Sequence, residues 1–190
     1  PNGVTVEYGG VEDEAMKSFS SLGRAMAIGF LVIMIILSAQ FQSIRQPFII
    51  ALAIPLSFIG VIFGLMVTRV PFGIMAFFGV VALMGVVVND AIVLIAHVND
   101  LREKGMRVKD ALIKAGRNRL RPIILTTVTT LAGMIPLSLN LAGGAEYWRP
   151  LAVSLIFGLA ISSFLTLIIV PVLYSLIESR SERKKLAKAG

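Results

Sequence analysis

Residues 72–98 read FGIMAFFGVVALMGVVVNDAIVLIAHV, an apolar run in which Asp90 is the one carboxylate. An α-helix rises 1.5 Å per residue, so about 20 apolar residues span the roughly 30 Å hydrocarbon core of a bilayer. A run of this length is typical of a transmembrane helix, because the apolar strands of soluble proteins are much shorter. The stretch therefore predicts a membrane-spanning helix, and it decides the fold class.

The composition of the whole chain agrees with a membrane protein. Its 190 residues are 56% hydrophobic and 15% charged, whereas soluble domains average roughly 45–50% apolar and about 25% charged residues. Cysteine is absent, which excludes a disulfide framework and a thiolate metal site. The net charge of +7 would suit a nucleic-acid-binding protein. The basic residues flank the apolar runs, however, so we interpret them as topology signals and expect no nucleic-acid partner.

Four further apolar segments accompany the first one. The five predicted spans cover about residues 22–41, 48–68, 72–99, 122–141 and 150–177. Each is long enough to cross the hydrocarbon core as a helix, in which every backbone polar group is satisfied within the segment. The pattern predicts an all-α membrane protein, a polytopic bundle of transmembrane helices.

The segments outside the spans have patterns of their own. Residues 4–8 alternate apolar and polar side chains, so residues 1–21 are interpreted as the last strand and linker of an outside domain. Apolar residues recur at helical spacing within about 106–118, which predicts an amphipathic helix on the cytoplasmic surface. Residues 179–190 form a basic tail. Without an initiator Met or a signal peptide, the chain is expected to be a fragment of a longer protein.

The basic residues predict the orientation. Fourteen of them lie on one side of the predicted spans: Arg45, Arg102, Lys104, Arg107, Lys109, Lys114, Arg117, Arg119, Arg121, Arg180, Arg183, Lys184, Lys185 and Lys188. The other side has four: Lys17, Arg24, Arg69 and Arg149. Cytoplasmic loops carry the excess of Lys and Arg, so the N-terminus is expected to be periplasmic and the C-terminus cytoplasmic.

Asp90 is the candidate for chemistry. An ionisable group in a spanning helix costs about 2.5–3.5 kcal/mol or more, so such residues usually have a function. Burial favours the protonated form of a carboxyl, which lets it bind and release a proton near neutral pH. The alternative is a structural carboxyl that stays protonated or hydrogen-bonded to a neighbouring helix.

Three residues of the following helix lie within reach of a similar depth. Thr126 and Thr127 could hydrogen-bond the Asp90 carboxyl or pass a proton through water, although membrane threonines often bond their own i−4 carbonyl. Arg119 is either a positive-inside anchor or a side chain that extends along the helix towards Asp90. No catalytic or metal-ligating set is indicated, and no GxxxxGK loop suggests ATP as the driver.

Four stretches carry a resemblance to the resistance-nodulation-division (RND) efflux transporters. They are GVVVNDAIVLIAHVNDLREKG at 85–105, RNRLRPIILTTVTTLAGMIPL at 117–137, AQFQSIRQPFIIALAIPLSFIGV at 39–61 and the closing WRPLAVSLIFGLAISSFLTLIIVPVLYSLIE at 148–178. Motif order and spacing resemble the C-terminal half of a twelve-helix repeat transporter. The chain would then supply helices eight to twelve, after the end of a periplasmic porter-type domain.

The resemblance implies a proton-driven, homotrimeric exporter of the bacterial inner membrane. Such transporters are drug:proton antiporters that confer multidrug resistance by exporting hydrophobic and amphiphilic compounds, and they work with a periplasmic adaptor and an outer-membrane channel. The coupling ion is the proton, no other cofactor is implied, and the protein is not an enzyme.

The resemblance also implies a coupling site. The family's relay lysine corresponds to Asn89, its arginine to Arg119 and its threonine to Thr126, whereas Asp90 occupies a neighbouring position that often holds asparagine. Because the lysine is missing, the usual relay cannot operate unchanged. We therefore hypothesise that Asp90 binds the proton itself, hydrogen-bonded by Asn89 and Thr126.

Three other functions remain open. The same fold could export metal ions or lipids, and a related bundle could be a non-transporting sterol- or lipid-sensing module. An intramembrane aspartyl protease needs two carboxylates that face one water, whereas this chain has one in its spans.

Overall fold

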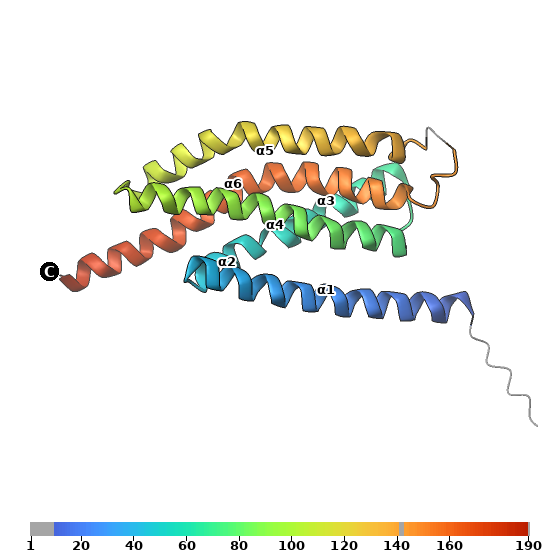
Figure 1. Cartoon of the computed structure of the whole chain (residues 1–190), viewed down its shortest axis with the longest axis horizontal. Coiled ribbons are helices and arrows are strands. Elements are labelled where there is room, and N and C mark those ends of the chain that lie inside the picture. Colours follow the sequence, from blue (N-terminus) through green and yellow to red (C-terminus); the bar gives the residue numbers. More distant parts are fainter. Residues whose placement is uncertain (1–9, 141–142, 190) are drawn as a thin grey trace, which may run out of the picture.

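The computed structural model describes residues 10–140 and 143–189, with side chains for residues 10, 13–140 and 143–178. Six helices follow one another: α1 Val11–Phe41, α2 Arg45–Ala51, α3 Ala53–Thr68, α4 Ile74–Glu103, α5 Val108–Ser138 and α6 Arg149–Ala189 (Figure 1). The described ranges contain no strand. The strand expected at residues 4–8 lies outside the described residues.

The helices form a membrane bundle. Five segments of the described chain are long and apolar enough to cross a bilayer: α1, α2 together with α3, α4, α5, and α6 as far as Glu178. The predicted fold class, an all-α bundle with five spans, is confirmed.

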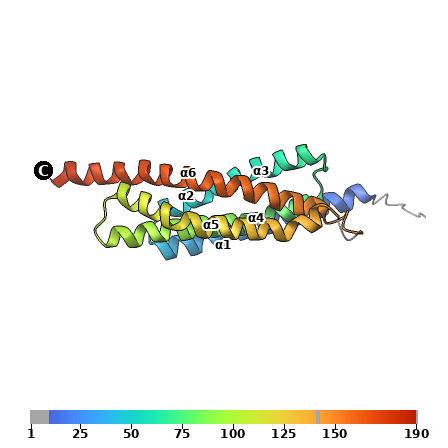
Figure 2. The same ribbon diagram turned by 90° about the horizontal axis from the view of Figure 1, so that it is seen from above.

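Helix α6 is at the centre of the bundle and packs against α3, α4 and α5, whereas α1, among the described helices, contacts α2 and α4 (Figures 1 and 2). The turns after α1 and α4 lie at the same end of the molecule as the C-terminal part of α6 (Figure 1). Because the basic residues of the 102–121 segment gather there, we call it the basic end. The connections α3–α4 and α5–α6 lie at the opposite end (Figure 1).

Glycines allow α6 to approach its neighbours closely. A Cβ built on Gly60 of α3 would contact the Phe157 carbonyl oxygen of α6 and lie 2.9 Å from Gly158 Cα. A Cβ on Gly79 of α4 would lie 2.7 Å from Ser154 Cβ. Helices in lipid gain no hydrophobic driving force when they associate, so their association relies on van der Waals contact between closely approaching backbones. Close backbone packing therefore fixes the positions of α3 and α4 on α6.

The first helix begins earlier than predicted. Residues 11–21, which were assigned to a linker, are the start of α1. Phe19 stacks on Phe72 at 6.4 Å between ring centroids and meets Phe77 edge-on at 5.8 Å. Aromatic pairs of this kind contribute about 0.5–1.5 kcal/mol each. The aromatic contact with the α3–α4 connection stabilises the early turns that the polar sequence did not reveal.

The second predicted span is formed by two helices in succession. Helix α2 ends at Ala51 and α3 begins at Ala53, and Leu52 between them keeps helical dihedral angles (φ −62°, ψ −19°). Pro55 lacks an N–H for the Ala51 carbonyl, and its ring crowds that carbonyl. The regular hydrogen bonding is therefore disturbed one turn before the proline, while Arg45–Thr68 remains one span, as predicted over 48–68.

The predicted surface helix at 106–118 and the span at 122–141 form one helix, α5, which contains Pro122. Val108, Ala111, Leu112 and Ala115 belong to the bundle core rather than to a membrane-surface face. Pro122 was expected at a helix start, whereas α5 runs through it. At the other end of the chain, α6 runs through the predicted tail to Ala189.

The Gly60 contact yields a prediction for stability. Gly60→Ala should lower the free energy of unfolding by about 1–3 kcal/mol, because the added methyl meets the backbone of α6. Thermal unfolding of the full-length protein in detergent measures the effect. Gly116→Ala is the matched control, since nothing lies within 4 Å of its Cβ and alanine favours helix by about 1 kcal/mol. Equal midpoints for the two variants would contradict the packing described.

Candidate functional site around Asp90

Asp90 lies near the middle of α4, which spans 30 residues. Thirteen residues separate it from Glu103, so it is about 20 Å from the basic end of the helix. The side chain is half-buried. Within the described part of the chain it has no hydrogen-bond or ion-pair partner. The carboxyl is therefore at membrane depth, on a face of α4 that the five spans leave partly open.

Helix α6 runs parallel to α4, and a regular ladder of contacts joins them. The Tyr174 hydroxyl donates to Asn99 Oδ1 at 2.8 Å, and Arg102 Nη1 donates to Glu178 Oε1 at 3.0 Å. The two residues of these pairs are 75 and 76 positions apart in the sequence, respectively. Gly79 and Ser154, which meet further along the two helices, are also 75 positions apart. The same offset places Asp90 level with Thr166.

Thr166 is the hydroxyl that the sequence analysis missed. It is buried, and its Oγ1 has no hydrogen-bond partner among the described side chains. A buried hydroxyl is normally hydrogen-bonded. The stretch Ile161–Thr166, which reads ISSFLT, carries three hydroxyl side chains inside an apolar run. That run of hydroxyls was the available signal for a polar stripe on α6.

Helix α5 runs antiparallel to α4 and brings Thr126 to the level of Asp90. Near the basic end, Asn118 Nδ2 lies 3.3 Å from His97 Nε2. Seven residues further along each helix, Asp90 is level with Leu125 and Thr126.

The hydroxyl of Thr126 is nevertheless used locally. It donates to the carbonyl oxygens of Ile123 at 2.9 Å and Pro122 at 3.2 Å. The second of these is the bond to the i−4 carbonyl that was the alternative expectation for this threonine. Both carbonyls belong to the helical turn that precedes Thr126. Thr126 is therefore at the right depth without a hydrogen bond to Asp90 in this conformation.

The remaining predicted residues lie at different distances from the carboxyl. Thr127 faces α6, where its hydroxyl donates to Ser163 Oγ at 3.1 Å. Arg119 is half-buried about two turns nearer the basic end, and it has no ion pair among the described residues. Asn89 is exposed on α4. The structure thus brings Thr126 to the level of Asp90, and it does not bring Arg119 or Thr127 into contact with the carboxyl.

A polar network joins α2, α4 and α6 at the basic end. Asn99 Oδ1 accepts hydrogen bonds from the Tyr174 hydroxyl at 2.8 Å and from Gln46 Nε2 at 3.2 Å. Arg102 Nη1 donates to the Tyr174 oxygen at 3.1 Å and to Glu178 at 3.0 Å. Tyr174 is 1% exposed. The network fixes the register of α4 against α6, and hence the residues that lie level with Asp90.

The sequence over residues 1–178 matches the AcrB/AcrD/AcrF family model. The chain belongs to this family. The resemblance to RND permeases is confirmed, and the chain is part of a multi-pass membrane protein.

Relatives and a solved structure agree with this assignment. The chain is 36% identical over 185 residues to the Swarming motility protein SwrC of Bacillus subtilis, covering 97% of this chain and 18% of that protein. It is 31% identical over 182 residues to the Cobalt-zinc-cadmium resistance protein CzcA of Cupriavidus metallidurans, covering 96% and 17%. A crystal structure of a heavy metal efflux pump superposes with a TM-score of 0.80 at 29% identity, covering 94% of this chain and 18% of that one. The chain thus spans less than a fifth of the length of these proteins.

The polar network makes a second prediction. Tyr174→Phe removes a buried hydroxyl that bridges Arg102 and Asn99, so the free energy of unfolding should fall by about 1–3 kcal/mol. Thermal unfolding of the full-length protein in detergent tests this. Tyr147→Phe, at a residue that is 63% exposed, should leave the midpoint unchanged. A Tyr174→Phe midpoint equal to that of the control would show that the network does not hold α4 on α6.

Proposed function

We propose that this chain is the membrane portion of the C-terminal half of a proton-driven exporter, in which the Asp90 carboxyl binds and releases protons. The placement of Asp90 carries the proposal. It is a half-buried carboxyl in the middle of a spanning helix, level with Thr126 of α5 and Thr166 of α6. A group that is this costly to insert usually has a function.

The two protonation states of Asp90 would favour different surroundings. The neutral carboxyl tolerates an apolar neighbour, whereas the carboxylate needs donors such as the Asn89 amide or the Thr166 hydroxyl. Protonation would then change which helix face packs on α4. A proton that crosses a potential of 100 mV supplies about 2.3 kcal/mol, so one or a few protons per cycle would drive such a shift. In this scheme the Asp90 carboxyl binds the proton, and Asn89 stands at the position of the family's relay lysine.

For the cargo we propose divalent transition-metal cations. The support comes from relatives named for cobalt, zinc and cadmium resistance and for nickel, cobalt and cadmium resistance, together with the structure titled a heavy metal efflux pump. The second candidate is the class expected from the sequence, hydrophobic and amphiphilic compounds. It is supported by SwrC, whose name refers to motility and to no metal.

The proposed assembly follows from family membership. We infer a homotrimer in the bacterial inner membrane, with a periplasmic adaptor and an outer-membrane channel as partners. The basic end of the bundle would be cytoplasmic, because the Lys and Arg residues of the α4–α5 region gather there. The protein would perform transport and no covalent chemistry.

The role of Asp90 can be tested in the full-length protein. In proteoliposomes that contain a pH-sensitive dye, adding Zn²⁺ or Co²⁺ should produce a proton flux. Asp90→Asn should reduce this flux to the level of empty liposomes, because the amide cannot be protonated in this pH range. Asp110→Asn is the control, since Asp110 is an exposed carboxylate in the first turn of α5.

Each other outcome has a definite meaning. Full proton flux in Asp90→Asn would contradict the coupling role, provided that the wild type is active. Flux with an amphiphilic cation such as ethidium, and none with metal ions, would replace the first cargo class by the second. A wild-type protein that binds these compounds and produces no proton flux would support the sensing alternative.

A further inference from the structure

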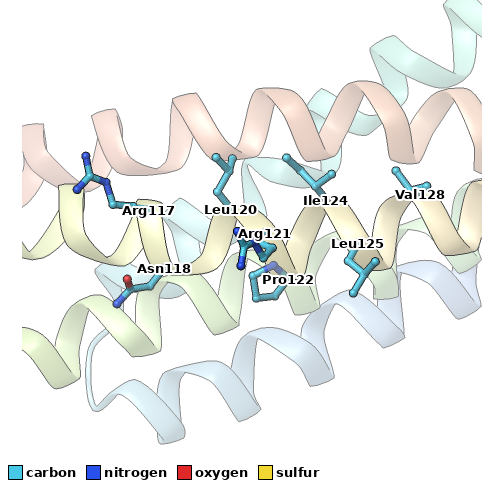
Figure 3. Close-up of a pocket in the computed structure, with 8 residues that line it drawn as sticks. All are labelled: Arg117, Asn118, Leu120, Arg121, Pro122, Ile124, Leu125 and Val128. Carbon is cyan, nitrogen blue, oxygen red and sulfur yellow. The ribbon is translucent and has the colours of Figure 1, made fainter.

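The outer side of α5 carries a groove at the basic end. Arg117 and Arg121 line it one turn apart, and Leu120, Ile124 and Val128 lie along the side of α5 that faces α6 (Figure 3). Its volume is about 830 Å³. A second groove of about 410 Å³ runs between α5 and α6, and it shares Leu120 and Ile124 with the first. The two grooves adjoin at Leu120 and Ile124, and we call them together the hollow. The first carries two arginines, and the second is lined mainly by apolar side chains.

The apolar interior is formed by both helices. Phe164 and Ile168 of α6 line it opposite Leu120 and Ile124 of α5. All four side chains are exposed, Phe164 to 68%. The hydroxyl groups nearby belong to Thr127 and Ser163, which are hydrogen-bonded to each other at 3.1 Å. The walls thus offer apolar surface, and these hydroxyls need no polar ligand.

The arginine side of the hollow faces away from the candidate coupling site, whereas Asn118, which also lines it, lies 3.3 Å from His97 of α4. At about 100° per residue, Arg117, Arg121 and Val128 project opposite to Arg119 and Thr126. The Arg119 side is the one that carries the buried residues of α5, such as Ala115. If a further helix packed over the Asp90 site, it would cover the Arg119 side of α5. The opposite side of α5, with Arg117 and Arg121, would still face lipid.

Charge and length indicate what the hollow holds. Arg117 and Arg121 are exposed and have no ion-pair partner among the described residues, and Lys114 lies one turn before them on the same side. The acidic residue of that side, Asp110, is about two turns beyond Arg117 and further from the hollow. From Arg117 to Val128 the helix rises about 17 Å, which is close to the hydrocarbon thickness of one leaflet.

We propose that this hollow binds one anionic phospholipid of the leaflet at the basic end. Its phosphate lies between Arg117 and Arg121, and one acyl chain lies between α5 and α6 along Leu120, Ile124, Phe164 and Ile168. Guanidinium groups bind phosphate oxygens in bidentate geometry, and basic residues beside a membrane attract anionic lipids. The proposal does not depend on proton coupling at Asp90.

The headgroup contact is tested by native mass spectrometry of the full-length protein in detergent, titrated with phosphatidylglycerol or phosphatidylcholine. The wild type should bind phosphatidylglycerol more tightly. Arg117→Gln with Arg121→Gln should weaken the tightest phosphatidylglycerol site roughly 30-fold, from about 1 kcal/mol per basic residue. The charge-matched control is Arg107→Gln with Lys109→Gln, two exposed residues of the same region that do not line the hollow. Equal weakening in both double variants, or none in the first, would overturn the proposal.

The acyl-chain contact is tested in vesicles of phosphatidylglycerol and phosphatidylcholine. A photoreactive p-benzoylphenylalanine at position 164 should crosslink to lipid, and the Arg117→Gln, Arg121→Gln background should reduce its phosphatidylglycerol adducts. The same probe at position 112, where Leu112 is 8% exposed and belongs to the bundle core, should give far fewer lipid adducts. Crosslinks from position 164 to protein instead of lipid would show that another helix or a second subunit occupies the hollow, and would refute the lipid assignment.

Discussion

The close approach of α4 and α6 is the contact on which the rest of the bundle depends. Helices in lipid gain little from the hydrophobic effect when they associate, so their register depends on shape and on a few hydrogen bonds. Here Gly79 brings α4 onto Ser154 of α6, and the Asn99–Tyr174 hydrogen bond of 2.8 Å fixes the other end. Together they set which residues of the two helices share a level.

This register determines the surroundings of Asp90. The carboxyl lies level with the buried Thr166 hydroxyl, and the antiparallel α5 supplies Thr126 at the same depth. The side chain of Thr126 is hydrogen-bonded to its own helix, and Arg119 forms no ion pair among the described residues. The donors nearest in level to Asp90 are therefore hydroxyl groups without charge. Such an environment allows the carboxyl to be neutral, which is consistent with a group that exchanges a proton.

The sequence contains some of these features and lacks others for physical reasons. Long apolar runs reveal spans directly, and Asp90 stands out in its run because lipid is a poor solvent for charge. Pro122 was assigned to a helix start from its local preference, yet α5 runs through it. The role of Phe19 depends on rings that come from a distant turn. Thr166 could not be matched to Asp90, because their common level follows from the register of two packed helices.

Helices α4 and α6 are held together at two levels, by the close approach at Gly79 and by the hydrogen bonds of Tyr174. These two contacts limit how the helices can move relative to each other. Interlocked backbones near Gly79 and the bridged Tyr174 hydroxyl sit on either side of Asp90 along the helix axis. A pair clamped at both ends translates or rotates as a single rod. Helix α5 is tied to this pair by the Asn118–His97 and Thr127–Ser163 contacts, whereas α1 does not pack against α6 in the described bundle. Relative movement at the level of Asp90 would therefore be a sliding of α1 past a stationary group of α4, α5 and α6.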